Sequence, residues 1–220
     1  MSVLQREIFF FSGTAYRAVE IILTKAGYWQ RTEPAGHKLR NSFTERKGGE
    51  SAMRYIYCPK CGSQLKNRPA GDDGGVPFCD SCGQYWFDSF SSVAIVLVAN
   101  EHQEIAMLRQ KYLSERYWNY VAGFIKPGET AEETAVREVR EELGLSIDHL
   151  EFAGTYWFGD RDQLILGFIG LVRKADFSLS VEVDAAEWIQ AGEAPARMFP
   201  VRPGNCQHPM YRKYLRMITK

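Results

Sequence analysis

The sequence has no long apolar run and no excess of charge of either sign, and both absences exclude classes of protein. No segment approaches the roughly 20 consecutive apolar residues of a membrane-spanning helix, and the N-terminal stretch contains Glu7 and an apolar run of only four residues. Lys plus Arg and Asp plus Glu number 27 each. The whole chain therefore generates no field that attracts nucleic acid or an anionic membrane. We expect a cytoplasmic protein with no membrane partner.

Internal repeats and low-complexity tracts are also missing, which leaves a globular organisation. The chain has 220 residues, 45% of them hydrophobic and 13% aromatic, enough for one substantial core and a smaller appendage. We predict three parts: an N-terminal extension at 1–52, a cysteine-rich subdomain at 53–88 and the main domain at 89–220.

The N-terminal extension divides into two segments of different composition. Apolar residues recur at helical spacing over residues 14–26, between Thr14 and Gly27, and predict a short helix there. Residues 31–50 are polar, mixed in charge and poor in apolar side chains, as linkers usually are, so we expect little fixed structure in them.

The main domain alternates strand-like and helix-like patterns. A continuous apolar run at 93–99 predicts a strand buried on both faces. Further strands are predicted at 104–109, 118–122, 152–157, 164–172 and 183–188, with helices at 131–143 and 210–218. The fold class is therefore α/β, with a mixed sheet flanked by helices.

Cysteines are few, but four of the five form two Cys-x-x-Cys pairs. Their spacing is typical of a closed tetrahedral zinc site with four thiolate ligands, and a site with no open position is structural. A thioredoxin-like redox pair is the alternative, but it would need one pair opening a helix beside a strand. The predicted zinc ligands are Cys58, Cys61, Cys79 and Cys82.

The segment 123–145, which we call the acidic segment, contains the strongest functional signal. Thr130 with Glu133 predicts a capping box, and Gly144 predicts the left-handed end of the helix. On this helix Glu138, Glu141 and Glu142 share a face at spacings of three and four residues.

Such like charges repel unless a cation lies among them, and hard carboxylate oxygens suit Mg²⁺ or Mn²⁺. Arg137 is expected to form an orienting ion pair with Glu129. An ordinary solvated acidic helix would explain the charges but not the glycines and caps at both ends.

At every position the acidic segment is similar to the Nudix box: glycine, five residues, Glu129, seven residues, Arg137-Glu138, an aliphatic residue, one residue, Glu141-Glu142, one residue, glycine and an aliphatic residue. The resemblance covers roughly residues 91–188. It implies an α/β/α sandwich, identifies Glu138, Glu141 and Glu142 as ligands of Mg²⁺ or Mn²⁺, and implies metal-assisted hydrolysis of a diphosphate. The proton of the attacking water would go to a box glutamate or to Glu182.

A zinc ribbon directly before such a domain resembles the NADH pyrophosphatase family, whose members split dinucleotides and are typically homodimers. Residues 182–188 also look like that family's Glu-Ile-x-x-Ala-x-Trp segment. The family's Ser-Gln-Pro-Trp-Pro-Phe-Pro signature is absent after the acidic segment. Trp157 and Phe158 are candidates for stacking on a base, and Arg109 for binding a substrate phosphate.

Three functions stay open at this point. The first is a hydrolase for a dinucleotide such as NAD(H), with nucleic acid as a partner only in the form of a capped RNA substrate. The second is a hydrolase for ADP-ribose or a nucleoside triphosphate. The third is a non-catalytic module that senses a nucleotide or uses the ribbon to bind nucleic acid.

Overall fold

The computed structural model describes residues 21–23, 29–31 and 55–219 and divides the chain into two units, Met1–Ala52 and Met53–Lys220. In the first unit β1 (Ile21–Leu23) pairs antiparallel with β2 (Trp29–Arg31). The helix that we predicted over 14–26 is therefore wrong at Ile21–Leu23. Two adjacent β-branched isoleucines favour a strand, and pairing with β2 outweighs the weak helical periodicity. The rest of the predicted helix and the linker at 32–50 lie outside the described residues.

The cysteine-rich part forms a small antiparallel sheet in the order β3-β4-β5. Its elements are β3 (Lys66–Pro69), the 3-10 helix η1 (Gly71–Asp73), β4 (Gly75–Cys79) and β5 (Gln84–Tyr85). Its core cluster consists of buried Cys58, Leu65 and Cys79, and Tyr55 and Trp86 pack against them. This core is too small to hold a fold of this size by apolar burial alone, so an additional staple is expected.

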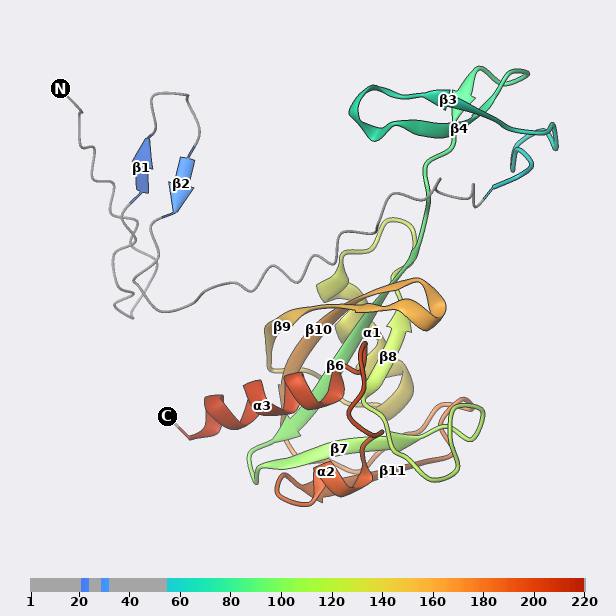
Figure 1. Ribbon diagram of the computed structural model, residues 1–220. Coiled ribbons are helices and arrows are strands. Elements are labelled where there is room, and N and C mark those ends of the chain that lie inside the picture. The colour runs from blue at the N-terminus through green and yellow to red at the C-terminus, as the bar shows by residue number, and fades with distance from the viewer. Residues whose placement is uncertain (1–20, 24–28, 32–54, 220) are drawn as a thin grey trace. The chain divides into compact units, whose positions relative to one another are not determined.

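The larger part is a six-stranded mixed sheet between helices, as predicted (Figure 1). Five strands follow the order β11-β7-β6-β10-β9, and β8 pairs with β6 beside them. β6 and β10 are parallel, and the other neighbours are antiparallel. The strands are β6 (Ser91–Asn100), β7 (Glu104–Arg109), β8 (Val121–Phe124), β9 (His149–Phe158), β10 (Gln163–Val172) and β11 (Ala185–Gln190).

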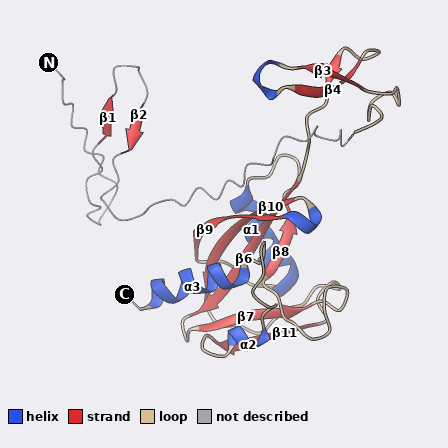
Figure 2. Ribbon diagram, in the orientation of Figure 1, coloured by secondary structure: helices blue, strands red, loops and turns tan. Residues whose placement is uncertain are grey.

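One helix lies on each face of this sheet (Figure 2). The long helices are α1 (Ala131–Leu143) and α3 (Gln207–Ile218), and the short ones are α2 (Ala194–Arg197) and the 3-10 helix η2 (Gly159–Arg161). In the part of the chain that is described, no helix combines the length and the apolar character needed to cross a membrane.

β6 separates two apolar cores, which confirms the prediction of a strand buried on both faces. Ala94, Val96 and Val98 point to one core, where they meet the stripe Ala135, Val139 and Leu143 of α1. The alternate residues Ile95 and Leu97 point to the other core, with Met210 and Tyr214 of α3. Alternation of side chains along a strand produces this division directly.

Two strands begin and end elsewhere than we predicted. The strand expected at 118–122 is β8 at Val121–Phe124, because Val93–Val96 of β6 pair with it, while Trp118 and Asn119 form only isolated bridges. The strand expected at 183–188 is β11 at Ala185–Gln190, because its register follows β7 from Arg109 to Glu104. In both cases pairing with a strand distant in sequence sets where the strand begins and ends. Local periodicity carries no information about that partner.

The predicted capping box at the start of α1 is present. The Thr130 hydroxyl accepts a hydrogen bond from the Glu133 amide at 3.1 Å, and the Glu133 carboxylate accepts one from the Thr130 amide at 2.8 Å. Gly144, with a φ of 71°, ends the helix in the left-handed conformation that was expected.

Replacing Thr130 by Ala is expected to destabilise the protein by about 1 kcal/mol, because one amide at the start of α1 loses its acceptor. The measurement is urea unfolding followed by circular dichroism. Thr155→Ala, at an exposed position of β9, is the matched control. Equal losses in the two variants would show that the cap contributes nothing of its own.

Candidate active site

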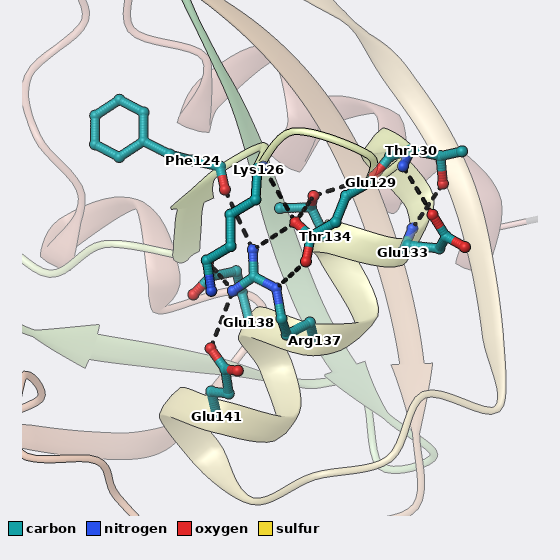
Figure 3. A network of polar contacts seen from close by, with 9 residues as sticks. All are labelled: Phe124, Lys126, Glu129, Thr130, Glu133, Thr134, Arg137, Glu138 and Glu141. Atoms are coloured by element: carbon teal, nitrogen blue, oxygen red, sulfur yellow. Dashed lines mark hydrogen bonds and ion pairs between the residues drawn. The ribbon is translucent and has the colours of Figure 1, made fainter.

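Arg137 organises the acidic segment by binding three carboxylates at once (Figure 3). It donates to the two oxygens of Glu129 at 2.7 and 2.9 Å, to Glu138 at 2.6 Å and to Glu141 at 3.0 Å. A further donor reaches the carbonyl oxygen of Phe124 at 3.2 Å. The predicted ion pair with Glu129 is thus present, and it is one part of a larger network.

The network holds the loop before α1 against the helix. The Arg137 guanidinium, with smaller contributions from the Thr134 hydroxyl and the Lys126 amide, lowers the pKa of Glu129 to about 2. Glu129 therefore carries its charge throughout the physiological range and serves as a fixed anchor for Arg137. Because its donors are occupied, Arg137 has little capacity left for a substrate.

Glu142 lies in a different environment from Glu138 and Glu141, the other two candidate ligands, which Arg137 binds. It is buried, its Oε1 accepts from the Gln110 amide at 3.3 Å, and its Oε2 has no partner among the described residues. Burial, together with the nearby charges of Glu138 and Glu182, raises the pKa of Glu142 to about 8. An uncompensated buried carboxylate is costly unless a cation or a proton accompanies it.

The carboxylate arrangement fits a hard divalent cation. Glu142 offers an unpartnered buried oxygen, and Gly123 leaves the space that the Glu138 carboxylate occupies: a Cβ at position 123 would lie 1.8 Å from Glu138 Oε1. Oxygen donors of this kind suit Mg²⁺ or Mn²⁺. Glu138, Glu141 and Glu142 remain the candidate ligands.

A cavity of about 570 Å³ adjoins this cluster. Its floor follows from the sheet register: Val93 lies opposite both Phe124 and Ile165, and Gln163 lies opposite Phe158, so these side chains share one face of the sheet. Glu138 and Glu141 line one side of the cavity, and the 199–206 loop contributes to another. The volume is in the range of small-molecule sites.

Of the other site residues predicted from the sequence, two line this cavity and two do not. Glu182 and Phe158 line it. Trp157 points away from Phe158, as neighbours on a strand must, and packs edge-on against Phe90 at 5.6 Å. Arg109 lies with its guanidinium 5.5 Å from the centre of the Trp118 ring, outside the cavity lining.

Several cavity residues were not singled out from the sequence. Gln110 holds Glu142, and Lys126, Arg161 and Arg202 add positive charge to the lining. Gln110 carries no motif, and the arginines lie outside the acidic segment. The only available signal was strand alternation, which puts Gln110 on the face opposite to Arg109.

The four paired cysteines converge in the small sheet. Their sulfur atoms all lie within 4.8 Å of one another, with separations of 3.5 Å for Cys61 and Cys79 and 4.0 Å for Cys58 and Cys82. Tetrahedral zinc with bonds of about 2.3 Å would place its sulfur ligands about 3.8 Å apart. Among the described residues no pair is joined as a disulfide, so the thiols are available to a metal.

Hydrogen bonds around the cluster favour the thiolate form of Cys61 and oppose that of Cys82. Ser63 lowers the pKa of Cys61 to about 6, whereas hydrogen bonding with the Cys61 sulfur and burial raise the pKa of Cys82 to about 12. Four thiolates this close need a cation, and zinc bound by four sulfurs has no open position for chemistry. A structural zinc site is therefore the role that this cluster fits.

Comparison with known proteins identifies the family of the larger part of the chain. The NUDIX domain family model matches residues 89–206, more than half of the chain. The NAD-capped RNA hydrolase NudC of Pseudomonas aeruginosa PAO1 is 30% identical over 150 residues, which cover 66% of this chain and 51% of that protein. NudC of Chromobacterium violaceum is 26% identical over 183 residues, covering 80% and 68%, and the NAD-capped RNA hydrolase ndx-9 of Caenorhabditis elegans is 31% identical over 143 residues, covering 62% and 37%.

The chain spans about half the length of the Pseudomonas relative. Among solved structures, a NUDIX hydrolase from Nitrosomonas europaea superimposes with a TM-score of 0.58 at 18% identity, covering 75% of this chain and 93% of that one. At that identity the likeness supports the α/β fold.

Gly123→Ala is expected to weaken Mn²⁺ binding by about tenfold or more, because the new methyl group would displace the Glu138 carboxylate. Titration calorimetry with Mn²⁺ measures the effect, and the melting temperature checks the fold. Gly192→Ala is the control, since a Cβ there meets nothing within 4 Å. Unchanged Mn²⁺ affinity in Gly123→Ala would remove Glu138 from the ligand set.

The purified protein is expected to contain one zinc ion per chain, and Cys79→Ser is expected to lose it, because Cys79 is a buried member of the cluster. Elemental analysis by mass spectrometry measures the metal. Cys206→Ser should keep its zinc, since Cys206 lies outside the cluster. Full zinc content in Cys79→Ser would contradict the assignment.

Proposed function

This chain belongs to the NUDIX family, and we propose that it is a metal-dependent hydrolase that cleaves the diphosphate linkage of a dinucleotide such as NAD(H), free or as the cap of an RNA. The observation that carries the proposal is the position of the Glu138 and Glu141 carboxylates at the edge of a dinucleotide-sized cavity, with buried Glu142 bound by Gln110, which also lines that cavity. The names of the relatives support the choice of substrate.

The three candidate ligands are held in place by different neighbours. Arg137 fixes Glu138 and Glu141 in direction, while buried Glu142 is restrained by Gln110. A Mg²⁺ or Mn²⁺ ion held by these residues would supply Lewis-acid polarisation of the diphosphate and make water nucleophilic at neutral pH. The structural zinc site has no part in this chemistry.

Glu182 is the proposed general base. It lines the cavity, is exposed to solvent and lies close enough to Glu142 to influence that group's pKa. Glu138 is less suited, because its carboxylate already accepts a hydrogen bond from Arg137 at 2.6 Å. Glu182 would accept a proton from water as the water oxygen bonds to phosphorus and the bridging oxygen leaves with the other mononucleotide.

The cavity offers apolar and aromatic surface for the nucleoside parts. Phe124 and Phe158 stand on one face of the sheet, with β6 and β10 between their strands. Three strand spacings of about 4.8 Å separate β8 from β9, which leaves room for more than one ring system. Aromatic faces of this kind can stack on any base, because stacking does not depend on the hydrogen-bonding pattern of the base.

The test is product analysis by chromatography after incubation with Mg²⁺ or Mn²⁺ and NADH, NAD, ADP-ribose, diadenosine polyphosphates or nucleoside triphosphates. Wild type should release AMP and the nicotinamide mononucleotide from NADH. Glu141→Gln and Glu182→Gln should each lower the rate by about a hundredfold or more, through loss of a metal ligand or of the base. Glu187→Gln, an exposed glutamate outside the cavity lining, is the control.

Each alternative predicts a different result in this assay. Cleavage of ADP-ribose or a nucleoside triphosphate alone would keep the hydrolase and reject the dinucleotide. No turnover of any substrate would favour a nucleotide-sensing module. Full activity in Glu182→Gln would show that Glu182 is not the general base and would favour a glutamate of the acidic segment instead.

A further inference from the structure

Lys126, Arg161 and Arg202 supply positive charge to the cavity beyond Arg137. Arg137 is neutralised by three carboxylates within 3.0 Å. Within the region that the structure describes, the side chains of Lys126 and Arg161 form no hydrogen bond or ion pair, and the anionic neighbour of Arg202 is Asp160 at 3.6 Å, beyond hydrogen-bonding distance. These three cations are therefore available to an anionic ligand.

The three cations belong to different walls of the cavity. Figure 3 shows the Lys126 side chain alongside Arg137, on the side of the glutamates. Arg161 lies in η2, after Phe158 on the chain, and Arg202 lies in the 199–206 loop. Lys126 is thus placed to meet the diphosphate that is cleaved, whereas the two arginines lie with Phe158 at the other end of the apolar floor.

Arg202 is held where it lies by contacts that leave its guanidinium donors free. Its guanidinium carbon is 5.6 Å from the centre of the Phe158 ring, a cation–π arrangement. The loop that carries it packs closely on the same strand: a Cβ added to Gly204 would lie 3.0 Å from the Phe158 ring and 3.1 Å from the Trp157 carbonyl oxygen. Asp160, the 3.6 Å neighbour of Arg202, directly precedes Arg161, which brings the two arginines to the same corner.

Asp160 offsets part of the charge of Arg202, and Arg161 has no ion-pair partner among the described residues. The planar forks of both arginines match the geometry of a phosphate group. The diphosphate itself would be bound by the cation that the glutamates hold and by Lys126. The positive charge that Asp160 leaves at this corner therefore corresponds to an additional phosphate on the substrate.

Resting on the proposed function, we propose that Arg161 and Arg202 form a subsite for a phosphate on the ribose of the adenosine half, beyond the scissile diphosphate. Two substrates present this group: a 2′-phosphorylated dinucleotide, and a dinucleotide cap whose 3′ oxygen continues into an RNA phosphodiester. The subsite would make Arg161 and Arg202 specificity-determining residues that act by binding, without touching the reacting atoms.

The experiment compares kcat/KM for NADH, NADPH and a short NAD-capped RNA in wild type, Arg161→Gln, Arg202→Gln and the double variant. Wild type should prefer at least one of the two phosphate-bearing substrates, and each single variant should reduce that preference by about tenfold while leaving NADH turnover nearly unchanged. Arg173→Gln is the matched control, because Arg173 is an exposed arginine next to the opposite end of β10, outside the cavity.

The two sources of the phosphate give different outcomes. Loss of a preference for NADPH alone assigns the 2′-phosphate, and loss of a preference for the capped RNA alone assigns the phosphodiester. Equal decreases for all three substrates, or preference ratios unchanged from wild type, would overturn the subsite. If wild type cleaves none of them, the proposed function fails separately, and calorimetric binding of ADP-ribose against 2′-phospho-ADP-ribose then decides the subsite: equal affinities in wild type would reject it.

Discussion

The functional part of this protein depends on one electrostatic arrangement, in which a single guanidinium holds three carboxylates. Glu129, Glu138 and Glu141 would repel one another at this proximity, and Arg137 offsets the repulsion with short hydrogen bonds to each. The arrangement fixes the loop, the helix and two candidate metal ligands at the same time. It leaves Glu142 outside, buried and with one unpartnered oxygen, so the charge of this carboxylate is compensated only by a cation or by a proton.

The sheet places this group of carboxylates beside the cavity. β6 has one core on each face, so α1 can pack firmly on one side while the cavity opens at the end of the other. The two sides meet at β8, where Gly123 faces the Glu138 carboxylate and its neighbour Phe124 belongs to the cavity floor. Any larger side chain at position 123 would fill the space of the carboxylate, so the glycine at the start of the acidic segment is needed for close approach and not for an unusual backbone angle.

The sequence was informative where structure is determined locally. The bounds of α1, its caps, its apolar stripe and the Arg137–Glu129 pair all follow from spacings within 20 residues, and each agrees with the structure. Prediction was poorer where distant strands decide: β8 and β11 are shifted, and Ile21–Leu23 is a strand. Among the substrate candidates, strand alternation puts Phe158 in the cavity and Trp157 outside it, a choice that two adjacent aromatics cannot reveal without the register.

Equal numbers of acidic and basic residues hide a separation of charge at the site. The acidic groups gather at the edge of α1, where a divalent ion would offset their charge, and Lys126, Arg161 and Arg202 line the remaining walls. In the proposed function, a substrate with several phosphates meets positive charge at both ends of the cavity, even though the chain as a whole carries no net charge. The diphosphate would be held where the cation binds, so the arginines at the far end would affect which nucleotide binds but not which bond is aligned for cleavage. The proposed arrangement separates substrate choice from chemistry, with the apolar floor of the sheet between the two.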